Sequence, residues 1–206
     1  MYLSRLLLDL RDRKVQRALE DPYRLHQAIL HAFPPDAPGG GGRVLFRVEP
    51  EREDGRARVL VQSALRPDWA SEALREHLPL ARFDQPKELS LALSAGQLLR
   101  FRLRANPTRR SQEKRLPVLG EEAQVAWLRR KMEGAGFELV AARQYDEGMR
   151  HGSRRRAEEE RRMTFVSVLY EGAIRVAMPD RAIAAVQGGI GSAKAFGFGL
   201  LSVARG

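Results

Sequence analysis

Apolar and polar positions repeat with two different periods along the first half of the chain, and together they predict an α+β fold. Residues 2–9 read as a strand, and residues 11–33 as a helical stretch interrupted at Asp21-Pro22. Asp21 can cap a helix and Pro22 can occupy its first turn. Apolar residues then recur every three or four positions, which predicts one buried helix face: Leu25, Ala28, Ile29, Ala32 and Phe33.

Three further segments complete the pattern of the first half. The Pro/Gly-rich stretch 34–42 predicts a loop. Residues 43–49 and 57–65 flank Asp54-Gly55, which predicts a hairpin, and a weaker helix follows over 68–78.

The segment 97–105 is the clearest strand in the sequence. Four apolar residues point to one face: Leu99, Phe101, Leu103 and Ala105. Arg100, Arg102 and Arg104 alternate with them on the other face, separated by roughly 6.6–6.8 Å. This separation is close to that of successive phosphates in a nucleic acid, although a solvated outer sheet face is an equally good interpretation of the row.

The second half repeats the plan of the first. Helices are predicted over 121–133 and 180–187, and Glu171-Gly172 is expected to form a hairpin turn. The predicted strands are 114–118, 137–144, 163–170, 173–178 and 198–204. The expected architecture is therefore α+β, with two tandem ferredoxin-like (βαββαβ, RRM-like) domains at 1–108 and 109–206. The surplus strand in the second domain predicts an inserted hairpin around 143–163.

Composition and charge narrow the class of protein. Cysteine is absent from the 206 residues, which excludes disulfides and thiolate metal sites and is typical of a cytoplasmic protein. No segment approaches the roughly 20 apolar residues of a membrane span, and no signal peptide is visible. A net charge of +10 favours a polyanionic partner, of which nucleic acid is the commonest. Arginine supplies most of this charge, and its planar fork suits phosphate.

Basic residues also gather outside the strand at 97–105. Arg109 and Arg110 follow it directly, so the basic surface continues beyond its end. Arg154, Arg155 and Arg156 lie in the expected inserted hairpin, and an arginine-rich protrusion suits the groove of an RNA helix. An ordinary charged loop explains the triplet about as well.

Tyr23 and His26 are the candidate catalytic pair. They lie three residues apart just after Pro22, so a helix places them on one face. Imidazole titrates near neutrality, and a phenol can donate a hydrogen bond. RNA carries its own nucleophile, the 2′-hydroxyl, so its cleavage requires only proton transfer and charge stabilisation. Alternatively, Tyr23 packs at a helix end and His26 is a surface histidine.

The sequence contains no recognisable metal-ligand set. The four histidines do not have metalloprotease spacing, and the acidic triplet at 158–160 lies beside arginines, as in a solvated loop. We therefore expect neither a metal ion nor another cofactor.

A glycine-rich run closes the chain over residues 188–199. It lacks the Gly-Lys-Ser/Thr of a phosphate-binding loop, and its helix-to-strand order is the reverse of a dinucleotide fingerprint. Its glycines would let the backbone approach a phosphate closely, and Lys194 could add a charge. A tight connection between two elements is the alternative.

Several of these motifs occur together in one known family. The opening strand, residues 21–26, the strand end at 101–108 and the terminal Gly-Ile-Gly-x-x-Lys-x-x-Gly-x-Gly run resemble the CasE (Cse3) endoribonucleases. Those proteins are the CRISPR repeat-processing subunits of type I-E Cascade. The motifs span residues 2–203, so the resemblance covers nearly the whole chain.

The resemblance implies an activity, a substrate and partners. It implies metal-independent cleavage at the 3′ base of a CRISPR repeat hairpin, leaving a 2′,3′-cyclic phosphate and a 5′-hydroxyl. It places the catalytic pair on Tyr23 and His26, with help from His31 or Lys194 left open. The expected partners are the CRISPR repeat RNA (crRNA) and other Cascade subunits, with no membrane. The alternatives are a non-catalytic RNA-hairpin-binding subunit and a generic polyanion binder.

Overall fold

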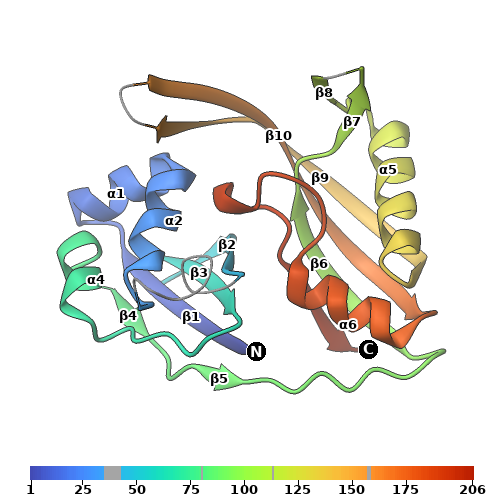
Figure 1. Cartoon of the computed structure of the whole chain (residues 1–206), viewed down its shortest axis with the longest axis horizontal. Helices are drawn as coiled ribbons and strands as arrows, with labels where there is room; N and C mark the ends of the chain where they lie inside the picture. Colours follow the sequence, from blue (N-terminus) through green and yellow to red (C-terminus); the bar gives the residue numbers. More distant parts are fainter. Residues whose placement is uncertain (35–42, 80, 113, 157–158) are drawn as a thin grey trace. The chain divides into compact units, whose positions relative to one another are not determined.

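The computed structural model describes residues 1–34, 43–79, 81–112, 114–156 and 159–206, except for the side chains of residue 53 and residues 154–161. The chain has a mixed α+β fold built on antiparallel sheets (Figure 1). Its contacts divide it into two compact units. The first unit comprises residues 1–90, 152–162 and 195–197, and the second comprises 91–151, 163–194 and 198–206. Most of the loop expected at 34–42 lies outside the described residues.

The first unit contains one sheet with helices beside it. Its elements are β1 (Tyr2–Asp9), α1 (Arg13–Glu20), α2 (Pro22–Leu30), β2 (Leu45–Glu53), β3 (Arg56–Ser63), α4 (Glu72–His77), β4 (Arg82–Phe83) and β5 (Lys87–Glu88). The strand order is β2-β3-β1-β4, and β5 also pairs with β1. β1 and β3 pair antiparallel over their full lengths, from Tyr2↔Ser63 to Asp9↔Arg56.

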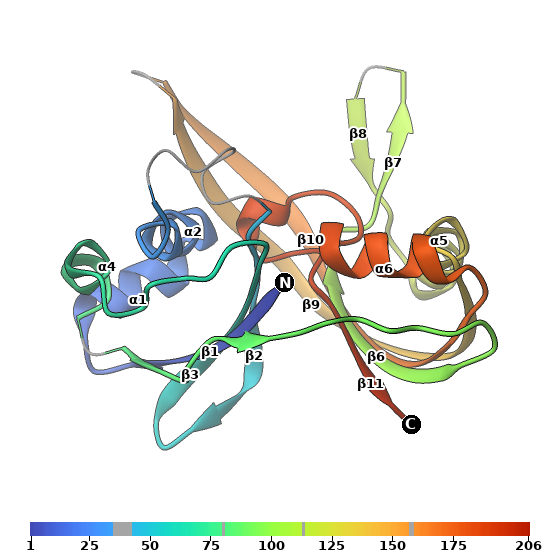
Figure 2. The same ribbon diagram turned by 60° about the horizontal axis from the view of Figure 1, so that its bottom comes forward.

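Alternation along β1 and β3 produces the core of this unit. Leu6, Leu8 and Val59 are fully buried, as their inward positions require. Leu25 and Ile29 of α2 pack into the same core, which confirms the buried face expected for that helix. In Figure 2, α1 and α2 lie along one side of strands β1–β3.

The second unit repeats this arrangement with a longer hairpin. Its elements are β6 (Leu98–Ala105), β7 (Thr108–Ser111), β8 (Lys114–Pro117), α5 (Glu121–Gly134), β9 (Phe137–Arg156), β10 (Glu159–Val176), α6 (Pro179–Gly188), η1 (Lys194–Phe196) and β11 (Leu201–Arg205). The second sheet has the order β11-β6-β10-β9, and β7 and β8 form a separate hairpin. The ends of β9 and β10 and most of η1 belong to the first unit.

Two sequence expectations need correction. The division at residue 108 assigns the strand at 97–105 to the first domain, but β6 pairs with β10 and β11 in the second sheet. The turn expected at Glu171-Gly172 is absent, since both residues lie within the continuous strand β10, opposite Arg102 and Phe101. The inserted hairpin is therefore the extension of β9 and β10 themselves (Figure 1).

Helices in the described part of the chain are all too short or too polar to cross a membrane.

Candidate active site and nucleic-acid interface

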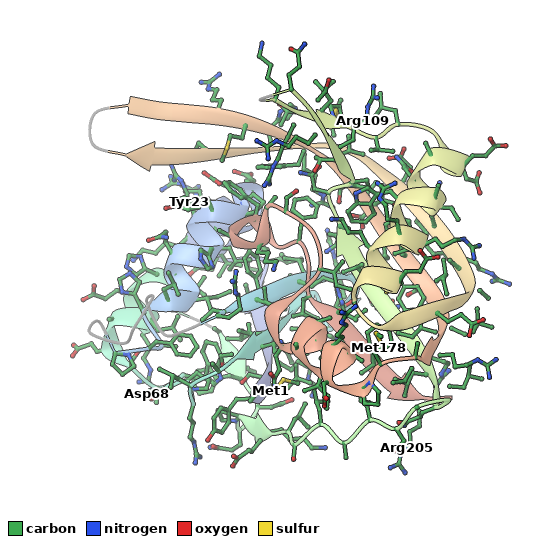
Figure 3. The ribbon with its side chains drawn as sticks, turned by 45° about the vertical axis from the view of Figure 1, so that its right-hand side comes forward. Met1, Tyr23, Asp68, Arg109, Met178 and Arg205 are labelled. Carbon is green, nitrogen blue, oxygen red and sulfur yellow. The ribbon has the colours of Figure 1, made fainter. Side chains whose placement is uncertain are left out.

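Helix α2 brings Tyr23 and His26 together. The carboxylate of Asp21 caps the helix, because Oδ1 accepts the backbone N–H of Tyr23 at 3.0 Å, and Pro22 occupies the first turn. The two rings lie one turn apart with their centroids 6.4 Å from each other, and both residues are half-buried. Figure 3 labels Tyr23 at the beginning of this helix. The sequence prediction that these residues share a helix face is confirmed.

Aromatic neighbours hold both rings. Tyr23 stacks on Phe196, with centroids 5.5 Å apart, and His26 stacks on Phe46 of β2 at 5.9 Å. Sequence reasoning did not identify either phenylalanine as a neighbour of the pair, because these ring contacts depend on how separate segments pack together.

Gly197 explains how the glycine-rich run reaches this cluster. Its φ is 80°, and a Cβ there would lie 3.1 Å from Cε2 of the buried Phe46. A side chain at this position would therefore meet the ring that supports His26. The glycine allows the close approach.

Burial determines the protonation of His26. Desolvation lowers the pKa of its imidazole from 6.5 to about 4, because a partly buried site disfavours the charged form. Its Nδ1 is buried and has no hydrogen-bond partner among the described residues. The ring is therefore neutral at pH 7 and able to accept a proton.

Lys194 is held by its own loop. Its Nζ donates a hydrogen bond to the carbonyl oxygen of Gly188 at 2.6 Å, and the residue is half-buried. The lysine thus ties the end of α6 to η1.

The three alternating arginines of β6 have three different environments. Arg100 is exposed, and Arg102 forms an ion pair with Glu171. Both line a hollow of about 750 Å³ on the second sheet. Arg104 is only 5% exposed, so the expectation of a uniform basic face is wrong at this position.

Glu147 of β9 is the reason Arg104 can be buried. Its Oε2 accepts Nε of Arg104 at 2.7 Å, its Oε1 accepts Nη2 at 2.6 Å, and Ser167 donates to the same carboxylate. Burial opposes ionisation of this carboxyl, but the arginine outweighs that cost, so the pKa of Glu147 is lowered. The pair fastens β9 to the neighbouring strands.

The structure gives less detail on the other arginines predicted to bind RNA. Arg109 and Arg110 are exposed on β7, and Figure 3 labels Arg109. Nε of Arg110 donates to the carbonyl of Gln112 at 3.3 Å. The backbone of Arg154, Arg155 and Arg156 belongs to β9, but their side chains lie outside the described residues.

The structure also brings together a histidine pair that the sequence did not reveal. His31, directly after α2, and His77, at the end of α4, stack with centroids 4.3 Å apart. Burial, followed by the charge of His77, lowers the pKa of His31. The pair lines a hollow of about 1030 Å³ on the first unit, whose lining includes Lys14, Arg17, Tyr23 and Arg24. The 46-residue separation carries no local signal.

Among the described residues, no group of three or more His, Asp or Glu side chains could hold a metal ion.

Comparison with known proteins identifies relatives that match nearly the whole chain. A family model described as "CRISPR associated protein" matches residues 1–205. The CRISPR-associated endoribonuclease Cse3 of Thermus thermophilus is 36% identical over 216 residues, covering 99% of this chain and 100% of that protein. The CRISPR system Cascade subunit CasE of Escherichia coli is 31% identical over 222 residues, covering 99% of each. A solved structure of Cse3 bound to a 19-nucleotide RNA superimposes with a TM-score of 0.87 at 36% identity, over all of both chains.

Proposed function

The chain belongs to the CRISPR-associated protein family, and on that premise we propose that it is an endoribonuclease that binds CRISPR repeat hairpins. Its product is mature crRNA cut from a precursor transcript. The relatives named as an endoribonuclease and as a Cascade subunit support this function, since each covers essentially the whole chain.

One observation carries the proposal for the active site. Tyr23 and His26 share one face of a capped helix, and burial keeps the imidazole neutral at pH 7. A neutral imidazole is a base, and the phenol beside it can donate a hydrogen bond. These two groups are sufficient for a reaction in which the substrate supplies the nucleophile.

The proposed reaction is a transesterification without a metal ion. His26 takes the proton of the ribose 2′-hydroxyl, and the 2′-oxygen attacks the adjacent phosphorus. The bond from phosphorus to the 5′-oxygen breaks, and that oxygen takes a proton from solvent water to become a 5′-hydroxyl, while the imidazolium returns its proton to the solvent. The other product ends in a 2′,3′-cyclic phosphate. Tyr23 donates a hydrogen bond that orients or stabilises the reacting phosphate. Because Nδ1 is buried, Nε2 is the nitrogen that exchanges the proton.

Each unit is proposed to be a ferredoxin-like domain. The support is the strand order, which in both sheets corresponds to fourth-first-third-second among the four strands of a βαββαβ unit. In this division the first unit carries the catalytic helix and, by its contacts, the arginine-rich end of the β9–β10 hairpin at residues 152–162. The second unit carries the rest of that hairpin and the start of the glycine-rich run.

Exposed arginines are proposed to hold the RNA. Arg100, Arg109 and Arg110 are exposed and form no ion pair with another described residue, and the triplet 154–156 lies on the hairpin strand β9. Arg102 and Lys194 would contribute beside their present partners. Arg104 is assigned to holding β9 through Glu147.

The proposed protein partners are other Cascade subunits. The support is the E. coli relative, which is named as a Cascade subunit and matches over 99% of each chain. Because the substrate is a transcript, the proposed site of action is the cytoplasm.

A labelled repeat RNA tests the proposal. The purified protein should shorten it in EDTA as well as in magnesium, with a cyclic phosphate on the upstream product. Tight hairpin binding without any shortening would instead support the alternative of a non-catalytic hairpin-binding subunit. Equal affinity for hairpin RNA and duplex DNA would support a generic polyanion binder.

A further inference from the structure

Asp21 has two hydrogen-bonding roles, one for each carboxylate oxygen. Oδ1 accepts the backbone N–H of Tyr23 and caps α2. Oδ2 accepts the hydroxyl of Ser153 at 2.7 Å, across 132 residues of sequence. Helix capping requires only the first of these bonds. The second bond therefore performs a task that α2 does not need for its own stability.

Ser153 lies on the arm, by which we mean residues 152–162 of the long β9–β10 hairpin. By their contacts these residues belong to the first unit, together with α2. The arginine triplet 154–156 follows Ser153 directly on the same strand. A contact at Ser153 thus fixes the arginine-rich strand next to the first turn of the helix that carries Tyr23 and His26.

The surroundings of Asp21 favour its hydrogen bond with Ser153. The side chain of Asp21 is only 17% exposed, so water competes weakly for Oδ2. Nε of Arg24 lies 3.7 Å from Oδ2, so the short bond to this oxygen comes from Ser153. Hydrogen bonds to a charged acceptor are about twice as strong as neutral ones.

We propose that the hydrogen bond between Ser153 and Asp21 is a positioning contact that couples the arm to the catalytic helix. It rests on the proposed ribonuclease function. RNA bound along the arm is thereby held at a fixed place relative to Tyr23 and His26. Ser153 and Asp21 are positioning residues, since they act through the pair and the arm. Without the bond, the RNA stays bound but is less often aligned for cleavage, and small misplacements have large effects on rate.

The test separates alignment from affinity. Ser153→Ala removes the donor, and Ser153→Thr retains a hydroxyl on a strand-compatible side chain. The matched control is Ser90→Ala, which makes the same change at an exposed serine outside the arm. Cleavage is measured in single turnovers at saturating protein. Affinity is measured separately with a repeat RNA that carries a 2′-deoxy sugar at the cleavage site and so cannot react.

We expect Ser153→Ala to lower the saturated cleavage rate about tenfold, with less than about a threefold change in affinity. Ser153→Thr should restore the rate, and Ser90→Ala should match the wild type. Asp21→Ser keeps a capping oxygen but removes the second acceptor. Its effect should not add to that of Ser153→Ala in the double variant, because both remove one bond.

Several results would overturn the coupling. These are a wild-type saturated rate in Ser153→Ala, a defect confined to affinity, no rescue by threonine, or additive effects in the double variant. Each leaves the ribonuclease function intact. Absence of cleavage by the wild-type protein would instead contradict the function itself.

Discussion

At the scale of the residue, the proposed chemistry depends on the burial of one imidazole. His26 stacks on Phe46, and the pKa of about 4 follows from desolvation rather than from a neighbouring charge. Such a ring can remove a proton from a 2′-hydroxyl at pH 7 but is a poor cation in the free protein. A bound phosphodiester supplies negative charge beside the ring, which favours the imidazolium form and raises its pKa.

The pH dependence of cleavage should reflect this difference. As pH falls, kcat/KM, which reports the free enzyme, should decline only toward pH 4. The limb in kcat, which reports the RNA complex, should lie at higher pH. Rates at limiting and at saturating protein between pH 4.5 and 8 distinguish the two limbs. A shared limb near the ordinary histidine value of 6.5 would contradict the assigned environment of His26.

Residue patterns in the sequence predict that Tyr23 and His26 share a helix face, but they do not predict the environment of every arginine. Alternation places Arg100, Arg102 and Arg104 on one face of β6, and alternation is a local property. Arg104 is nevertheless buried, because Glu147, which is 43 residues away, neutralises it. A charge can be buried when such a partner is present, and the sequence pattern does not show the partner.

The buried pair Arg104–Glu147 gives a stability prediction. Glu147→Gln leaves the guanidinium without its carboxylate and should lower the free energy of unfolding by about 2 kcal/mol. Glu138→Gln is the matched control, because Glu138 pairs with Arg175 at the surface, where both side chains are about half exposed or more. The control should lower the free energy of unfolding by less than about 1 kcal/mol. Urea unfolding measures both, and equal changes would show that burial does not matter here.

At the scale of the element, the close packing of Gly172 explains why the turn predicted there does not form. The pattern predicts a turn at Gly172, yet this residue lies within β10, where a Cβ would sit 2.0 Å from the carbonyl oxygen of Ala141. The glycine permits two strands to approach closely instead of reversing the chain. Local alternation also cannot indicate that β6 belongs to the second sheet, because strand pairing depends on segments far apart in the chain.

Gly197 carries a prediction at this scale. Gly197→Ala forces a side chain at φ 80° against Phe46, and should cost about 1–2 kcal/mol of stability while displacing the ring that supports His26. Cleavage should fall more than RNA affinity. Gly188→Ala is the control, since an added Cβ there meets nothing within 4 Å. Unfolding curves and single-turnover rates of both variants check the prediction, which fails if the two behave alike.

At the scale of the whole molecule, charge organises binding. A net charge of +10 attracts RNA without choosing its sequence, so part of the affinity should vary with salt. Composition alone predicts that RNA binding depends on salt, because the net charge is a sum over residues and does not depend on the fold. Which arginines contribute depends on exposure, which only the fold determines.

The salt dependence of binding can assign individual arginines to the RNA interface. Replacing Arg109 or Arg110 by Ala should weaken hairpin binding, because each guanidinium neutralises a phosphate. The slope of log affinity against log salt should become shallower by about 0.7–0.9 for each phosphate that is no longer neutralised. Arg75→Ala is the control, since Arg75 is exposed on α4 and does not line the hollow near Tyr23. Binding titrations across salt concentrations give the slopes, and unchanged slopes in the β7 variants would remove these two arginines from the interface.

The most direct test of the central claim is the single-turnover cleavage of labelled repeat RNA by His26→Ala. A general base contributes roughly 10²–10⁴-fold to a rate, so the variant should cut at least about a hundredfold more slowly while binding the hairpin with nearly wild-type affinity. Cleavage within a few-fold of the wild-type rate would contradict the assignment of proton transfer to His26.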